Sequence, residues 1–388
     1  MAYISSNNNR FYVALEQGYG SVGQIAAVNR IPAVKLTVKQ VPEKVQRKDK
    51  TGSRTFVGLP ANLRKATNFD LTTYMSSWSD QTTAPAHGPL FQAGLGGPPA
   101  LWAGGTAATP PDPSKVTFVS AHGLAPGQGV SNGGEIRFVS AVVNDNTIQL
   151  NAPFSSATAG GTLGPTVTYQ PASDLTSLSI FDYWSPGTAV QRILSGAAVN
   201  QVKIKVNGDF HEFEFSGQAS DVVDSSSFEA GAASLTNFPA EPAVQPLDSS
   251  IVPGHLGQIW LGSAPNQFFT VTKAQLIFDN ALDLRANEFG STLPRAIAPG
   301  ERSVTFDFSL YQQDDSGTQA LYQAARQRSP ISVMMQLGQQ QGELFGIYMN
   351  GVMPEVPEFD DSETRQQWQF QTCRAQGIVD DEIYLAFA

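Results

Sequence analysis

The sequence is poor in the residues that mark cross-links, membranes and strong charge. Its 388 residues include one cysteine, Cys373, and charged residues make up 15% of the chain. A single cysteine excludes a disulfide within the chain. No apolar run approaches the roughly 20 residues of a membrane span, and the N-terminal stretch lacks the basic-then-apolar layout of a signal peptide. We therefore expect a soluble protein that is made in a cytoplasm.

Residue patterns that would indicate catalysis or metal binding are also scarce. GxGxxG occurs at Gly18–Gly23, but a dinucleotide site needs an acidic residue about 20 positions on, and that region is a basic loop. The four histidines are scattered without metal-ligand spacing, and GxSxG is absent. The pairs Asp360-Asp361 and Asp380-Asp381 match no calcium loop. We predict no enzyme activity, no cofactor and no metal site.

What the sequence does contain indicates strands, loops and several domains. It has 35 glycines, 25 prolines and 41% hydrophobic residues, and a chain of this length usually folds as two or three domains. The net charge of −10 disfavours general affinity for nucleic acid. Residues 1–66 hold 11 Lys or Arg and 3 Asp or Glu, whereas residues 218–388 hold 8 and 21. This asymmetry favours head-to-tail association of copies.

Two distant segments have nearly the same sequence. TNFDLTTY at 67–74 is matched by VTFDFSLY at 304–311, so that Asp70 corresponds to Asp307, 237 positions on. Both alternate apolar and polar residues, as half-buried strands do. A predicted short helix follows each strand: Pro89 opens the first, and Thr318 is the expected cap of the second.

The correspondence continues to the end of the chain with one large gap. Phe213 and Phe215 match Trp368 and Phe370 at an offset of 155. The change of offset means that the first copy carries about 76 extra residues, roughly 98–173, whose short strand-like runs indicate a small β-barrel or sandwich. An internal duplication of this kind means that the predicted fold contains two similar units side by side.

We predict a mainly β (α+β) fold with two tandem β-sandwich or barrel units, each with a short helix, and one small inserted β-domain. The expected boundaries are an N-terminal arm at 1–30, a discontinuous first unit at 31–97 and 174–224, the insert at 98–173, a linker at 225–265 and a second unit at 266–388.

The order of these parts resembles the tail tube proteins (major tail proteins) of long-tailed bacteriophages. The resemblance rests on IPAVKLTVKQV, TNFDLTTY, GPLFQAGLG and GDFHEFEFSG in the first copy. In the second copy it rests on AQLIFDNAL, PRAIAPGERSVTFDFSLY, PISVMMQLG and DDEIYLAFA. It covers most of 30–217 and 266–388, whereas the insert departs from a minimal tube unit. The motifs that carry the resemblance consist mostly of residues expected to shape strands and helices.

The resemblance implies a structural virion protein of the phage tail, assembled in the bacterial host cytoplasm. Members form stacked rings that make a hollow conduit for DNA ejection. A chain with two tube units would close a homotrimeric, pseudo-hexameric ring, since assemblies favour closed symmetry. Its partners would be copies of itself and the tail terminator, baseplate or tip and tape-measure proteins, and DNA would pass through without specific binding.

Two sets of residues are candidates for this role. The first lies in a basic loop and its counterpart in the second copy, as candidates for contacts between rings or subunits: Lys44, Arg47, Lys48, Lys50, Arg54, Arg285 and Glu288. We expect the five cations of the basic loop to contact an acidic surface from the C-terminal half of another subunit. A solvated loop or a DNA contact are the alternatives. The second set is acidic, lies on predicted polar strand faces and is expected to line the lumen, with ordinary solvated faces as the alternative: Asp70, Glu212, Glu214 and Asp307.

Other functions remain open at this stage. The protein is alternatively another tail or baseplate component, which its copy number per particle would distinguish. The inserted domain at 98–173 is alternatively a module that binds a host-surface glycan, which binding by that block would test.

Overall fold

The computed structural model shows a mainly β chain. It describes residues 3–43, 45, 48–56, 58, 63–108, 112–156, 158, 160–247, 250–362 and 364–388. Within these residues, 19 strands join one antiparallel sheet, and smaller sheets contain four, two and two strands. Two short 3-10 helices, η1 (Ala27–Asn29) and η2 (Ala232–Ser234), lie in connections. No described helix is long and apolar enough to cross a membrane.

The first unit is built on a sheet with the strand order β3-β4-β15-β14-β13-β1. Strand β4 alternates as the sequence predicts, with Phe69 and Leu71 buried and Asp70 exposed between them. Strand β16 pairs with the first residues of the long strand β14. The strands are β1 (Asn9–Leu15), β2 (Arg30–Ile31), β3 (Ala33–Pro42), β4 (Lys65–Tyr74), β13 (Leu178–Trp184), β14 (Arg192–Val206), β15 (Glu212–Ala219) and β16 (Asp221–Asp224).

The second unit repeats this order as β19-β22-β26-β24-β23-β17, and β27 pairs with the first residues of β24 as β16 does with β14. The strands are β17 (Gly257–Gly262), β18 (Asn266–Gln267), β19 (Val271–Asp279), β20 (Asp283–Leu284), β21 (Ile297–Ala298), β22 (Ser303–Tyr311), β23 (Ile331–Leu337), β24 (Phe345–Met353), β25 (Glu358–Asp360), β26 (Gln367–Ala375) and β27 (Tyr384–Phe387).

Two segments outside the expected units take part in these sheets. Strand β1 lies in the expected N-terminal arm, yet it pairs with β13 along seven residues, and Tyr12 and Val13 are fully buried. Strand β17 lies in the expected linker and occupies the same place beside β23. Both units therefore include a strand that the alternation of the sequence did not single out.

The inserted segment folds around its own small core beside the second unit. A four-stranded sheet in the order β7-β10-β9-β8 is joined to the β6–β11 pair by single bridges, Ala107 with Phe118 and Ser131 with Gly164. These strands close a small barrel, called the inserted barrel below, around a core that includes Val116, Phe118, Val130 and Ile148. The flanking strands β5 and β12 pair with each other, and β12 also pairs with β27 of the second unit. The strands are β5 (Ala100–Trp102), β6 (Gly105–Thr106), β7 (Lys115–Thr117), β8 (Gly129–Asn132), β9 (Glu135–Asn144), β10 (Thr147–Leu150), β11 (Thr162–Leu163) and β12 (Thr166–Tyr169).

Each unit has the predicted short helix after its strand. Helix α1 (Gly88–Leu95) has Pro89 in its first turn and ends at Gly96, whose φ of 96° suits glycine. Helix α2 (Ser316–Gln327) differs from the sequence prediction in its cap. Asp315, not Thr318, is the N-cap: its carboxylate accepts hydrogen bonds from the Thr318 backbone at 2.9 Å and from the Thr318 hydroxyl at 2.7 Å.

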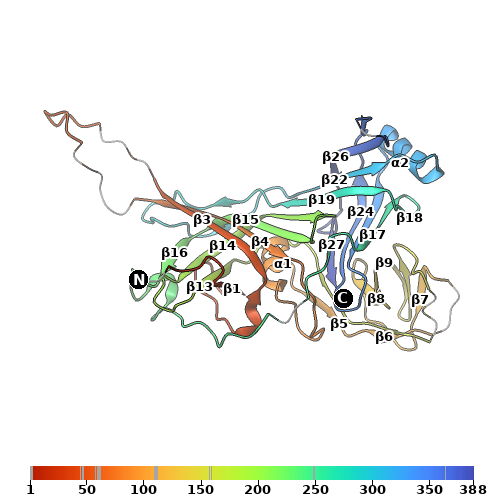
Figure 1. Cartoon of the computed structure of the whole chain (residues 1–388), viewed down its shortest axis with the longest axis horizontal. Coiled ribbons are helices and arrows are strands. Elements are labelled where there is room, and N and C mark those ends of the chain that lie inside the picture. Colours follow the sequence, from red (N-terminus) through yellow and green to blue (C-terminus); the bar gives the residue numbers. More distant parts are fainter. Residues whose placement is uncertain are drawn as a thin grey trace.

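The two units share one continuous core. Phe91 of α1 packs against Phe213 of the first unit at a ring distance of 5.2 Å and against Phe345 and Phe387 of the second at 5.5 and 5.6 Å. The C-terminal half of β14 pairs with β19, so the sheet also passes from one unit into the other. Figure 1 shows this sheet along the long axis of the molecule, with β7, β8 and β9 beside the second unit.

Candidate assembly surfaces

One face of the large sheet is polar and carries all four acidic residues of the second candidate set. In the strand register, Asp70 lies opposite Ser216, and Glu214 lies opposite Lys203. Continuing through β14 and β19, the same face reaches Asp307, opposite Gln275. The opposite face holds the buried phenylalanines. The alternation of each strand thus brings together acidic residues that lie far apart in the sequence.

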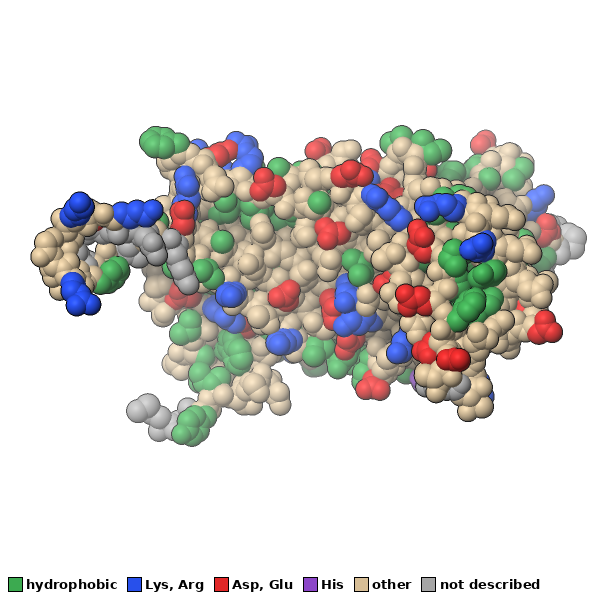
Figure 2. Space-filling model, turned by 90° about the horizontal axis from the view of Figure 1, so that it is seen from above, with side chains coloured by type: hydrophobic (Ala, Val, Ile, Leu, Met, Phe, Trp, Pro, Cys, Tyr) green, Lys and Arg blue, Asp and Glu red, His purple; other side chains and the backbone are tan. Residues whose placement is uncertain are grey.

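Lysines stand beside these carboxylates. Lys203 Nζ lies 3.9 Å from a carboxylate oxygen of Glu214, and Lys205 also pairs with Glu214. On β3 the register places Lys35 and Lys39 on this face as well. Figure 2 shows acidic and basic side chains interspersed over the surface of the molecule seen from above. The face is therefore of mixed charge and not purely acidic. Sequence reasoning overlooked this because it weighed the net charge of the chain and not the lysines in the same strands.

The basic loop joins β3 to β4 and extends away from the body (Figure 1). Of its five candidate cations, Lys44 and Arg47 lie outside the described residues. Lys48, Lys50 and Arg54 are exposed. The sequence prediction that this loop connects two neighbouring antiparallel strands agrees with the pairing of β3 and β4.

The corresponding loop of the second unit, residues 280–302, lies against the first unit of the same chain. The Lys65 backbone N–H donates to the Thr292 carbonyl at 3.1 Å, and the Ser220 hydroxyl donates to the Pro294 carbonyl at 3.3 Å. Within this loop, Arg285 and Glu288 form an ion pair with each other. Arg64 at the base of β4 donates to the Glu288 carbonyl at 3.5 Å.

The outer strands of the joined sheet have open edges. Strand β3 pairs with β4 alone, and β25 pairs with β26 alone, in the part of the chain that the structure describes. An open edge presents unpaired N–H and C=O groups, which favours pairing with another strand. Sequence reasoning named the loops and missed these edges, since no residue type marks an edge strand.

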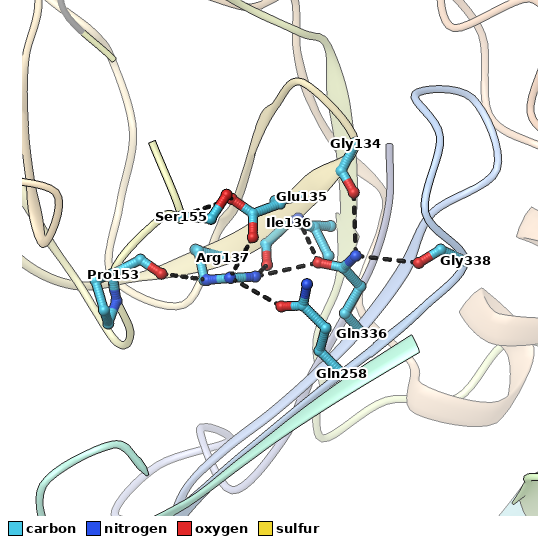
Figure 3. A network of polar contacts seen from close by, with 9 residues as sticks. All are labelled: Gly134, Glu135, Ile136, Arg137, Pro153, Ser155, Gln258, Gln336 and Gly338. Atoms are coloured by element: carbon cyan, nitrogen blue, oxygen red, sulfur yellow. Dashed lines mark hydrogen bonds and ion pairs between the residues drawn. The ribbon is translucent and has the colours of Figure 1, made fainter. Parts of the chain in front are cut away.

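The inserted barrel is fixed to the second unit by a buried arginine (Figure 3). Arg137 of β9 is fully buried and donates to Glu135 at 3.0 Å. It also donates to the side-chain oxygens of Gln258 in β17 and Gln336 in β23, both at 3.1 Å. The Arg137 guanidinium lies 5.3 Å from the Trp260 ring centre. The lone cation between apolar residues in EIRFVS was the available sequence signal, and sequence reasoning passed over it.

The GxGxxG segment wraps around a buried carboxylate and forms a turn. Glu16 accepts hydrogen bonds from the backbone N–H of Gly20 and of Gly196, both at 2.8 Å, and from the hydroxyls of Ser177 and Ser179 at 2.6 and 2.7 Å. Burial raises the pKa of Glu16. Gly23 N–H likewise donates to the Ser179 hydroxyl at 3.1 Å. Two N–H groups that could contact a phosphate in a dinucleotide site, those of Gly20 and Gly23, therefore bind side chains of the same chain.

Three of the four histidines, His87, His122 and His211, lie inside the protein. Burial lowers the pKa of His87 to about 4, and its ring stands edge-on to Phe213. Burial also lowers the pKa of His211, whose Nε2 lies 2.9 Å from the Leu256 carbonyl. Among the described residues, no group of three or more His, Cys, Asp or Glu is placed to hold a metal ion. The contacts of His87 and His211 are therefore those of structural residues inside the protein.

A family model described as phage tail tube protein matches residues 88–365, which is more than half of the chain. The chain belongs to the phage tail tube protein family. The match runs from α1 through the inserted barrel into the second unit. No curated protein matches the sequence.

Membership in this family confirms the sequence-based identification and the mainly β fold. A phage tail tube protein is a structural component of the virion tail that assembles with copies of itself into a tube. The open strand edges, the polar sheet face and the extended loop are the surfaces that such an assembly has available.

Proposed function

We propose that three copies of this tail tube protein close each ring, and that stacked rings form the conduit through which phage DNA is ejected. Each ring would have six tube units and pseudo-sixfold symmetry. The tube would assemble in the host cytoplasm, around a tape-measure protein and between the tail tip or baseplate and the terminator.

The observation that carries this proposal is the repeated strand order of the two units and their edge-to-edge pairing. Strand β14 of the first unit pairs with β19 of the second over six residue pairs. This contact leaves β3 open at one end and β25 open at the other, within the described residues. A heterologous contact of this kind closes into a ring when the rotation between copies permits it.

The polar sheet face suits the wall of a conduit. Its carboxylates include Asp70, Glu212 and Asp307. Two of its lysines, Lys203 and Lys205, pair with Glu214. DNA affinity grows with the number of phosphates that cations neutralise. A wall in which lysines pair with carboxylates would hold the duplex weakly and let it slide.

The β3–β4 loop is proposed to reach the neighbouring subunit. Within the chain, the loop of the second unit rests on Arg64 and Lys65 at the base of β4. The offset of 237 makes Glu301 and Arg302 the corresponding residues at the base of β22. Glu301 has an 88% exposed side chain. A basic loop that docks as its counterpart does would therefore meet an acidic residue of the next copy.

Negative-stain electron microscopy and native mass spectrometry of the purified protein test the proposal directly. We expect hollow rings or tubes with threefold averages, and a ring mass of three chains of 41.5 kDa each. Rings of six chains would contradict the stoichiometry. A compact monomer across concentration and salt, even with purified tail-tip complex added as an initiator, would contradict the ring itself.

A further inference from the structure

The pairing of β14 with β19, called the internal junction below, shows how two tube units meet. Val202 lies opposite Phe278 and Ile204 opposite Leu276 in this junction. Ile204 is fully buried and Leu276 is 1% exposed. The edge of one unit thus buries its apolar face against the first strand of the next unit.

In the first unit, the internal junction is formed by residues 201–206 of β14. Strand β25 takes the same position in the second unit. Lys203 of β14 lies opposite Glu214, and Glu358 of β25 lies opposite Gln369. Both partners in the second pair are 155 positions beyond those in the first, the offset already seen in the sequence. The register of the two hairpins is therefore the same.

Strand β3 is likewise the equivalent in the first unit of β19. Val38 of β3 lies opposite Phe69, and Leu276 of β19 lies opposite Phe306. Because Phe69 and Phe306 match in the sequence repeat, Val38 takes the position of Leu276. The chain thus has an equivalent of each half of the internal junction, one at each end of its sheet.

The positions on the outer edges are more exposed than the matching positions of the internal junction, as expected for strands that lack a partner. Phe359 of β25 takes the position of Ile204, yet it is 55% exposed. Val38 is only half-buried, although it packs on the same core as Leu276. Phe359 stacks on Trp368 with ring centres 5.5 Å apart. The Phe359 ring is therefore packed against Trp368 and is also exposed to solvent.

We propose that the outer edge of β3 in one copy pairs antiparallel with β25 of the next copy, in the register of the internal junction. This subunit junction rests on the proposed ring and specifies its contacts. Phe359 then lies opposite Val38, and Glu358 opposite Lys39. Opposite charges in such a cross-strand pair stabilise it.

Charge favours a second copy over an unrelated strand as the occupant of these edges. The equivalents of Glu358 and Lys39 in the internal junction are Lys203 and Ile277, which carry no complementary charges. The two outer edges would instead set an acidic residue opposite a lysine. Each edge therefore fits the opposite edge of the same chain, which is the condition for head-to-tail closure.

Paired cysteines test the register. Lys39→Cys with Glu358→Cys, and Val38→Cys with Phe359→Cys, place thiols directly opposite each other in neighbouring copies. Adjacent pairs alternate between wide and narrow spacing, so one of the two suits a disulfide. Lys35→Cys with Glu358→Cys is the off-register control. Burial raises the pKa of Cys373 to about 11, so the native thiol adds little background.

We expect oxidation to give covalent trimers in denaturing gels for one opposite pair and not for the control pair. Rings that form without either cross-link would overturn the proposed register while leaving the ring standing. Absence of both rings and cross-links would overturn the ring and the junction together.

Charge reversal tests the same contact without cysteines. Lys39→Glu is expected to lower ring yield about fivefold at low salt, because it sets like charges opposite each other, and Lys39→Glu with Glu358→Lys is expected to restore it. Lys115→Glu, on the inserted barrel, makes the same change in net charge and should have no effect. Circular dichroism checks that each variant is folded. A double variant no better than the single one would overturn the pairing.

Discussion

At the scale of single residues, burial sets the behaviour of the histidines. Burial lowers the pKa of His87 to about 4 and also lowers that of His211. An unfolded histidine has a pKa of about 6.5, so the unfolded chain binds more protons than the folded one between these pH values. Folding stability is therefore fully present above pH 6.5 and falls as the pH drops towards 4.

The first prediction follows from His87. We expect the free energy of unfolding to fall by about 2 kcal/mol between pH 7 and pH 5 from this residue alone. His87→Leu should flatten the slope by that amount, and His255→Leu, at an exposed position, should leave it nearly unchanged. Urea denaturation at both pH values measures the difference. An unaltered slope in His87→Leu would contradict a buried neutral imidazole.

At the scale of elements, the repeat made strands and helices predictable. The alternation in 67–74 and 304–311 predicted β4 and β22, and Pro89 and the run after Thr318 predicted both helices. Sequence reasoning placed β1 in an arm and β17 in a linker, because NRFYVAL and GQIWLG lack clear alternation of apolar and polar residues. In the structure these strands pair with β13 and β23. The Asp315 cap was missed because Thr318 is itself a good cap residue.

The assembly surfaces were less accessible to sequence reasoning. The acidic lumen candidates were found because strand period alone places them on one face. Their lysine neighbours come from β14, whose pairing with β15 depends on the whole sheet. The open edges of β3 and β25 are properties of pairing and not of residue type. Arg137 was missed because its partners, Gln258 and Gln336, are more than a hundred residues away.

The second prediction concerns the β3–β4 loop. Arg54→Glu, at its described exposed part, should slow tube growth about fivefold at low salt, since an interfacial charge of this kind contributes up to ~1 kcal/mol. Screening should reduce the effect at high salt. Light scattering during assembly measures it, with Lys115→Glu as the matched charge control. Equal slowing by both variants would show a general charge effect and would contradict docking of the loop on Glu301.

At the scale of the whole molecule, the inserted barrel and the second unit share one buried ionic network. Arg137 and Glu135 come from the barrel, whereas Gln258 and Gln336 come from the second unit. The buried Phe138 of the barrel also stacks on Tyr348 at 5.4 Å. A buried charge must keep its partners when the protein is folded. The barrel and the second unit are therefore expected to unfold in one cooperative transition.

The last prediction separates the two parts by removing the shared charge. Arg137→Met leaves Glu135 buried without its cation, and we expect a loss of about 3–5 kcal/mol together with a second, lower calorimetric transition for the barrel. Glu135→Gln added to Arg137→Met should recover part of that loss, because no unpaired charge is then buried. A single transition with near-native stability in Arg137→Met would show that apolar contacts such as Phe138 with Tyr348 hold the barrel without the ionic network. Tube formation by such a variant would also show whether a rigidly held barrel is needed for ring closure.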